Sequence, residues 1–239
     1  MLQPAFQSVL TARTREQFRE EVVRFSRALG FDTVAATSVV DHSVNEAEFD
    51  TVDNTPESFH AVYKNRSNWR RDPVMQHIKR QSVPIVWNQA TYVESGMGEM
   101  WEEQAQFGYR CGIALALHLP EGRHFLLGVN RDSALPAETV ALTRAVADLQ
   151  LFAVCAQETA WRVILPRESD AHSINVRLTP RELECLKWTM DGKTAWEVGS
   201  ILSITERTAV LHIGNAMRKL DCNSKHQAVL KALRLGLIR

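Results

Sequence analysis

The sequence ITERTAVLHIGNAMRKL, residues 204–220, predicts a long amphipathic helix near the end of the chain. Thr205 is a typical helix N-cap, and apolar residues recur at helical spacing after it. At 100° per residue, one side of the helix comprises Ala209, Ile213, Ala216 and Leu220. The opposite side comprises Arg207, Leu211, Gly214 and Arg218, with Val210 on its flank. The outward face is therefore basic at both ends and apolar in the middle.

Further helices are predicted on both sides of this stretch. Thr179 and Glu182 form a capping box around a proline, which starts one helix. Thr194 caps a short second helix, and Asn223 caps a last one. Two helices joined by a three- to four-residue turn, the second of them exposed, are typical of a helix-turn-helix motif. A four-helix packing unit with no role at DNA is the alternative interpretation.

Charge is distributed unevenly along the chain, although Lys+Arg and Asp+Glu both total 28. Residues 174–239 hold 11 basic and 6 acidic side chains, whereas residues 1–173 hold 17 and 22. A basic C-terminal part favours a polyanionic partner. The polar segment 165–175 lacks periodicity and predicts a linker between a domain of residues 1–164 and a domain of residues 176–239.

The N-terminal part alternates helical patterns with apolar strands. Helical patterns cover residues 3–29, 56–69, 98–108 and 136–164, and strand patterns cover residues 31–40, 83–87, 112–119 and 124–131. The last two strands are joined by a tight connection and predict a hairpin. We therefore predict an α+β protein, with an N-terminal α/β/α sandwich and a C-terminal four-helix helix-turn-helix domain.

Several classes of protein are disfavoured by the composition. The four cysteines form no CxxC pair, and the eight histidines show no metal-ligand spacing. No run of about 18 apolar residues and no signal pattern is visible. We therefore expect a cytoplasmic protein that is not an enzyme, has no catalytic or metal site, no cofactor and no membrane segment.

Residues 178–220 resemble the DNA-binding domain of the LuxR family, in the pattern LTPRE, GKT, E, IL and NAMRKL. The resemblance implies double-stranded promoter DNA with a palindromic site, bound by a homodimer. It places the DNA contacts at Thr194, Arg207, Thr208, Val210, Leu211, His212, Gly214, Asn215, Arg218 and Lys219.

Two of these positions depart from the family pattern. Val210 and Gly214 stand where similar domains often carry a polar or basic side chain. These apolar positions can contact thymine methyl groups but form no hydrogen bonds to base edges. DNA shape and half-site spacing would therefore contribute more to the choice of DNA sequence than direct base reading. Two alternatives stay open for each of two residues. Leu211 either contacts DNA or has no role there, and Arg207 either contacts DNA or forms an internal ion pair with Glu182 or Glu184.

Residues 59–87 and the later YRCG, residues 109–112, resemble the acyl-homoserine-lactone-binding domain of quorum-sensing receptors. The matching landmarks are Tyr63, Asp72, Pro73, Trp87 and Gly112. The resemblance implies a small-molecule ligand, an acyl homoserine lactone, and a ligand site at Thr55, Phe59, Tyr63, Asp72, Trp87, Trp101, Gly112 and Gly128.

These residues suit such a ligand. Asp72 can accept the amide N–H, and Trp87 can form a wall beside the lactone ring. Trp101 either closes the far end or is an ordinary core aromatic residue.

Three positions lack a polar group that the family often has there. Phe59 replaces tryptophan, Thr55 replaces tyrosine, and Gly128 replaces serine or threonine. The larger pocket accommodates a bulkier acyl chain or another ligand class.

The sequence therefore predicts a quorum-sensing transcription factor that binds a lactone and DNA as a homodimer. The alternatives are a receptor for a different small molecule and a ligand-independent or antagonistic regulator that forms mixed dimers with a sibling receptor. A lactone-cleaving enzyme is disfavoured, because the histidines are dispersed and because Cys111, which would need a nearby base to act as a nucleophile, fits a small buried residue instead.

Overall fold

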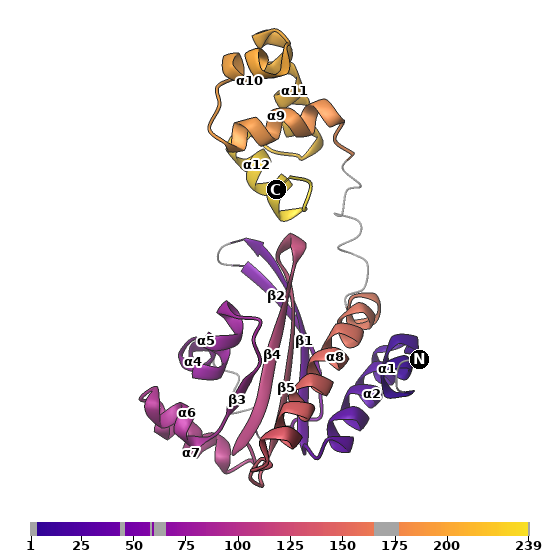
Figure 1. The fold of residues 1–239 in the computed structure, drawn as a ribbon, viewed down its shortest axis with the longest axis vertical. Helices are drawn as coiled ribbons and strands as arrows, with labels where there is room; N and C mark the ends of the chain where they lie inside the picture. Colours follow the sequence, from indigo (N-terminus) through magenta and orange to yellow (C-terminus); the bar gives the residue numbers. More distant parts are fainter. Residues whose placement is uncertain (1–3, 44–45, 58, 60–65, 165–176, 239) are drawn as a thin grey trace. The chain divides into compact units, whose positions relative to one another are not determined.

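The computed structural model describes residues 4–43, 46–57, 59, 66–164 and 177–238 (Figure 1). The chain divides into two compact units, one on each side of residues 165–176, residues 120–122 aside. The predicted linker lies outside the described residues.

A five-stranded antiparallel sheet forms the centre of the N-terminal unit. Its strand order is β2-β1-β5-β4-β3. The strands are β1 (Thr33–Ser43), β2 (Glu46–Asp53), β3 (Ile85–Trp87), β4 (Cys111–Leu119) and β5 (Arg123–Arg131). β4 and β5 pair as the predicted hairpin through the short turn η1 (Pro120–Gly122). The edge strand β2 was not predicted, because acidic residues interrupt its alternation.

Helices cover both faces of this sheet (Figure 1). One face carries α1 (Pro4–Thr11), α2 (Arg15–Ala28) and α8 (Thr139–Val163). The other carries α4 (Arg66–Arg71), α5 (Pro73–Arg80), α6 (Gln89–Glu94) and α7 (Gly98–Ala105). This confirms the predicted sandwich. The prediction of one continuous helix over residues 3–29 is wrong, because Thr14 accepts a hydrogen bond from the Gln17 N–H and starts a second helix.

Large side chains fill the space between the sheet and the helices α1, α2 and α8. Phe125, Leu127 and Val129 of β5 point into this layer and are almost fully buried. Phe25 and Phe152 stack above the sheet with ring centroids 3.9 Å apart. By length and composition α8 could cross a membrane, yet one side of it, including Leu149 and Phe152, is buried in this core.

Side chains near the end of α8 tie the first helix to the rest of the unit. The Thr159 hydroxyl donates to the Val9 carbonyl at 2.8 Å. The Arg162 guanidinium donates to the carbonyls of Leu10 and Ala12 at 2.8 and 2.9 Å. The last carbonyls of α1, which have no partner within the helix, are satisfied in this way.

The C-terminal unit consists of α9 (Pro180–Met190), α10 (Ala195–Leu202), α11 (Glu206–Lys219) and α12 (Lys225–Arg234). These are the four predicted helices. The cap of the last one was assigned wrongly: the Ser224 hydroxyl accepts from the Gln227 N–H, while the Asn223 N–H donates to the Gln227 side chain. Small residues such as Ala216, Ala228 and Ala232 let the helices pack closely.

Candidate functional site

The turn between α10 and α11 has a fixed geometry. Ser203 adopts a left-handed conformation with φ of 55°, and the Ile204 N–H donates to the Gly199 carbonyl at 2.9 Å. A Cβ atom at Gly199 would lie 2.9 Å from the Ile204 carbonyl oxygen and 3.1 Å from the Glu206 nitrogen. Only glycine therefore permits this close packing of α10 on the turn. The helices α10 and α11 therefore have the arrangement of a helix-turn-helix motif.

The outward face of α11 is exposed as the periodicity predicts. Arg207, Gly214 and Arg218 are exposed, and between them Val210 and Leu211 retain 54% and 58% of their accessible surface. The opposite side, with Ala209, is buried. A basic, apolar, basic surface thus faces solvent along more than three turns of helix.

The acidic partners suggested for Arg207 are occupied by other cations. Glu182 accepts from the Lys219 ammonium at 2.7 Å, and Glu184 accepts from Arg181 at 2.9 Å. Burial raises the pKa of Glu182, but hydrogen bonds from Lys219 and Thr179 outweigh it, so the pKa lies below its usual value. Among the described residues Arg207 forms no ion pair.

Lys219 therefore lies differently from Arg207, because its ammonium donates to Glu182 and to the Arg177 carbonyl. The other candidate DNA contacts lie at or near the surface of the helix pair. The Thr194 hydroxyl belongs to a capping box with Glu197, the Thr208 hydroxyl pairs with Thr205, the Asn215 side chain accepts from Arg218, and His212 is half-buried.

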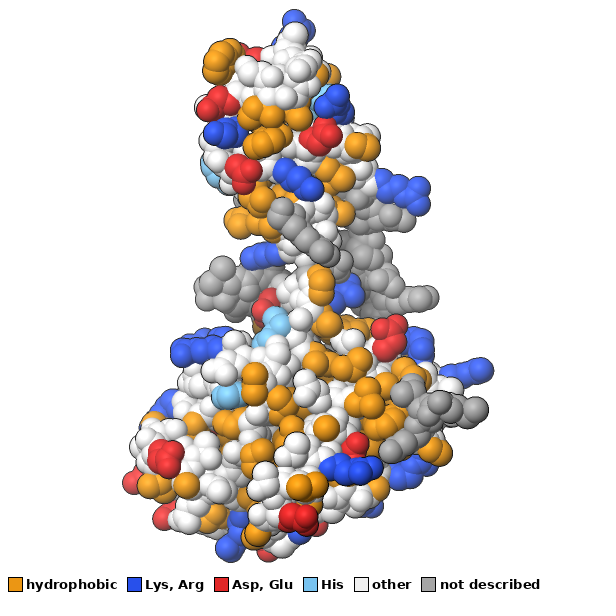
Figure 2. All heavy atoms as spheres, viewed as in Figure 1, with side chains coloured by type: hydrophobic (Ala, Val, Ile, Leu, Met, Phe, Trp, Pro, Cys, Tyr) orange, Lys and Arg blue, Asp and Glu red, His pale blue; other side chains and the backbone are white. Residues whose placement is uncertain are grey.

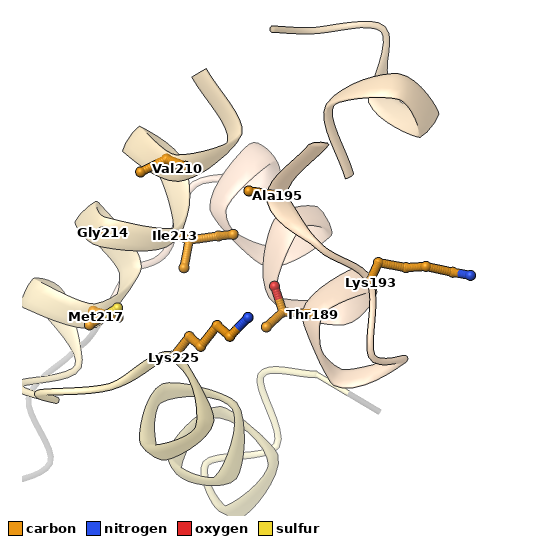
Figure 3. Close-up of a pocket in the computed structure, with 8 residues that line it drawn as sticks. All are labelled: Thr189, Lys193, Ala195, Val210, Ile213, Gly214, Met217 and Lys225. Atoms are coloured by element: carbon orange, nitrogen blue, oxygen red, sulfur yellow. The ribbon is translucent and has the colours of Figure 1, made fainter. Parts of the chain in front are cut away.

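Two lysines near this surface were missed by the sequence analysis. An open hollow of about 410 Å³ is lined by Val210 and Gly214 of α11 together with Lys193 and Lys225. Lys225, in the first turn of α12, reaches into the hollow toward Thr189, whereas Lys193 points away from it (Figure 3). Positive side chains beside helix N-termini are suited to phosphate groups. The sequence signal that could have identified them is their position: Lys193 directly precedes the N-cap Thr194, and Lys225 directly follows the N-cap Ser224.

In the N-terminal unit, Trp87 and Gly112 lie opposite each other on β3 and β4. A Cβ atom at Gly112 would lie 2.9 Å from the Trp87 indole ring and 2.2 Å from the Val129 carbonyl oxygen. The glycine is needed so that the indole can lie close to the strand. Trp87 itself is buried, at 3% exposure.

Asp72 is a buried carboxylate that is anchored by the start of α5. It is 4% exposed, and its Oδ1 accepts from the backbone N–H groups of Val74 and Met75 at 2.8 and 3.3 Å. The Tyr92 hydroxyl lies 3.3 Å from each carboxylate oxygen and 3.4 Å from Gln104 Oε1. Burial, and then the charge of Asp72, raise the pKa of Tyr92, which keeps its proton. Tyr92 and Gln104 were not predicted.

A second aromatic group surrounds Phe59. The Tyr109 ring stacks on Phe59 with centroids 4.1 Å apart and planes within 8°, and Phe107 meets Phe59 edge-on at 5.6 Å. The Tyr109 hydroxyl donates to Thr55 Oγ1 at 3.1 Å. Tyr109 was also missed, and Trp101 packs beside this cluster with its indole N–H donating to the Arg110 carbonyl.

One row across this face of the sheet carries only small side chains. Ala35, Gly128 and Ala114 are directly paired across β1, β5 and β4, and we call this row the small-residue row. Apart from Gly128 itself and its two chain neighbours, no described residue has a heavy atom within 4 Å of a Cβ placed at Gly128. Tyr63, the remaining candidate, lies outside the described residues. Within the described ranges no group of three or more His, Cys, Asp or Glu side chains is placed to hold a metal ion.

Two family models match the chain. The model described as autoinducer binding domain matches residues 14–160, and that of the bacterial regulatory proteins of the luxR family matches residues 176–232. The chain belongs to the LuxR family. It is a LuxR-type quorum-sensing transcriptional regulator, and its relatives are transcription factors rather than enzymes.

Curated LuxR-type relatives match over most of their length. The regulator RpaR of Rhodopseudomonas palustris is 32% identical over 214 residues, covering 88% of this chain and 84% of that protein. The transcriptional activator SolR of Ralstonia solanacearum is 31% identical over 238 residues, covering 99% and 98%. AhyR of Aeromonas hydrophila is 28% identical over 229 residues, covering 93% and 86%.

Solved LuxR-type structures share the fold. SdiA in complex with octanoyl-rac-glycerol has a TM-score of 0.71 and 25% identity, over 98% of this chain and 92% of that one. The lactone-dependent factor CepR2 of Burkholderia cenocepacia has a TM-score of 0.59 and 23% identity, over 68% and 94%.

Proposed function

We propose that this regulator binds an acyl homoserine lactone in its N-terminal unit and, as a cytoplasmic homodimer, binds palindromic promoter DNA. The proposed ligand rests on one observation: the carboxylate of Asp72 is anchored in an apolar surrounding that includes Trp87. A buried carboxylate favours an N–H donor, and the ligand amide supplies one. The indole supplies a flat apolar wall for the lactone ring.

A second ligand class has a specific observation in its favour. The related SdiA structure contains octanoyl-rac-glycerol, which carries an acyl ester and no amide N–H. Phe59 lacks the N–H donor of the tryptophan usual there, which weakens the case for a lactone ring. A thermal-shift experiment must therefore include both ligand classes.

The ligand test is a thermal-shift series on the full-length protein with N-acyl-L-homoserine lactones of four to fourteen carbons and with octanoyl-glycerol. A ligand that binds only the folded state raises Tm, so we expect a shift of several degrees for some lactones. Asp72→Asn keeps a good N-cap for α5 but removes the carboxylate, so it should abolish the lactone response while leaving the unliganded Tm nearly unchanged. A response to octanoyl-glycerol alone would favour the other ligand class.

The homodimer is supported by an apolar strip on α8. Val140, Leu151 and Val154 are exposed, and hydrophobic side chains gather on the face of the unit formed by α8 and its neighbouring helices (Figure 2). An exposed apolar strip on a long helix fits a second copy of the same helix. Leu151→Glu should shift the protein from dimer to monomer in light scattering, and a dimeric variant would contradict this assignment.

DNA binding is tested by gel shift with a palindromic site. Arg207→Ala should weaken binding and lower the slope of log affinity against log salt by about one, because one phosphate contact is lost. Asp191→Ala, an acidic surface change in the same unit, is a control that should not weaken binding. If no palindromic site is bound while mixed dimers with a sibling receptor form, the antagonist alternative replaces this part of the proposal.

A further inference from the structure

We infer that the Tyr109 hydroxyl, together with that of Thr55, holds the acyl carbonyl oxygen of the ligand. This inference rests on the proposed function and adds to it a hydroxyl pair at a defined place on the sheet. Tyr109 is outside the landmarks that identify the ligand-binding domain from sequence. Its hydroxyl nevertheless reaches Thr55 Oγ1, on a segment far from it along the chain.

Thr55 is held in place by its backbone. Its N–H donates to Asp53 Oδ1 at 2.9 Å, directly after β2. The neighbouring Asn54 fastens the segment to β1, because its side chain accepts from the Val34 N–H at 2.8 Å and donates to the Asp32 carbonyl at 3.0 Å. The backbone that carries the Thr55 hydroxyl is therefore held in place.

Tyr109 is equally constrained. It is 6% exposed, and its ring is clamped flat against Phe59. Burial raises the pKa of Tyr109 more than its hydrogen bonds with Thr55 and Thr33 lower it, so the phenol stays protonated and is a donor.

Hydroxyl groups that hydrogen-bond to other hydroxyl groups can be redirected at little cost. A hydroxyl rotates about its C–O bond and can both donate and accept. A carbonyl oxygen placed beside the pair can accept from Tyr109 and from Thr55, and neither hydroxyl is then left without a partner. A carbonyl oxygen can accept both hydroxyl protons. A ligand group that can only donate accepts neither of them, so it would be held less well.

The pair also lies beside the space that an acyl chain needs. Thr33, which bonds to Tyr109, is on the same face of β1 as Ala35, two residues further along the strand. Ala35 begins the small-residue row, at whose centre Gly128 leaves the sheet uncovered by described atoms within 4 Å. A carbonyl bound by the hydroxyl pair would place the first carbons of the chain over this row.

The test uses the full-length protein and the lactone of the thermal-shift series with the largest effect, labelled with carbon-13 at the acyl carbonyl. Tyr109→Phe keeps the ring and its stack on Phe59 but removes the hydroxyl. We expect about two- to tenfold weaker binding by calorimetry. We also expect the labelled carbonyl band in the infrared difference spectrum to move to higher frequency, because a hydrogen bond to the oxygen is lost.

Two further variants complete the experiment. Thr37→Val is the matched control, because the Thr37 hydroxyl pairs with Thr51 on the same face of the sheet and is absent from the proposed contact. It should change neither affinity nor the carbonyl band. Thr55→Val should move the band in the same direction as Tyr109→Phe and replaces it as the test if that variant does not fold.

The outcomes separate this inference from the proposed function. Lactone binding by the wild type, with an unchanged carbonyl band in Tyr109→Phe and in Thr55→Val, overturns the contact even if affinity falls, and leaves the lactone receptor intact. A wild type that binds no lactone overturns the proposed ligand and the contact with it. A band shift confined to the two hydroxyl variants supports the inference.

Discussion

The two faces of the same sheet are built from alternate residues of the same strands, yet they differ in side-chain size. On β5, Phe125, Leu127 and Val129 face α8 and are buried against large neighbours. The intervening Gly128 belongs to the small-residue row on the other face. Adjacent residues in a strand point to opposite sides, so one strand can both fill a core and leave room. One face is filled by large apolar side chains, and on the other we propose the ligand site.

The largest expected loss of stability comes from removing a large side chain from the face of the sheet that packs against α8. Leu127→Ala removes a side chain that is 2% exposed and should lower the free energy of unfolding by about 3–5 kcal/mol. The neighbouring Leu126→Ala, on the half-buried opposite face, should cost about 1–2 kcal/mol. Urea denaturation of both variants measures the difference, and equal losses would show that the two faces of β5 are packed equally tightly.

A slightly smaller loss of stability is expected at Gly112, where neighbouring atoms already occupy the space beside the glycine. Gly112→Ala places a Cβ 2.2 Å from the Val129 carbonyl oxygen, and a backbone atom cannot easily give way. We expect a loss of about 2–3 kcal/mol in the free energy of unfolding, measured in the same denaturation series. A stable Gly112→Ala protein would show that β4 and β5 can separate at this point.

Filling the open part of the same face should affect ligand binding rather than folding. Gly128→Val adds a side chain where no described atom lies within 4 Å, and valine is favoured in strands. Affinity for the best lactone should fall about tenfold, equivalent to about 1.4 kcal/mol, with Tm unchanged or raised. Calorimetry measures the affinity, and undiminished binding would mean that the acyl chain does not pass over Gly128.

The smallest effect is expected for Gly128→Ala. A methyl group meets no described atom there, and alanine restricts the unfolded chain more than glycine does. The protein should gain up to about 1 kcal/mol of stability and lose little affinity. Destabilisation of this variant, comparable to that of Gly112→Ala, would show that the two glycines have the same structural role.

Local patterns predicted the elements that local interactions determine. The apolar periodicity and N-cap of α11 require only neighbouring residues, and the alternation of β4 and β5 is equally local. The edge strand β2 was missed because acidic residues interrupt its apolar pattern, which an edge strand tolerates. Helix boundaries at Thr14 and Ser224 depend on which of several polar residues forms the cap.

Contacts between distant residues could not be read from the sequence. Tyr109 meets Thr55 across 54 positions, and Lys219 meets Glu182 across 37. The motif at Asp72 and Trp87 was recognised, but the partner Tyr92 depends on how α5 and α6 meet in three dimensions. Each of these pairs is set by packing rather than by spacing along the chain.

The bonds from α8 to α1 also determine when the N-terminal unit can be completed during synthesis. Val9 and its partner Thr159 are separated by 150 residues. At about 5–20 residues per second, a ribosome needs roughly 8–30 s to add the second partner after the first. During that interval the nascent chain has no complete unit to enclose a ligand. The first helix of the unit therefore lacks these anchors until its last helix has been made.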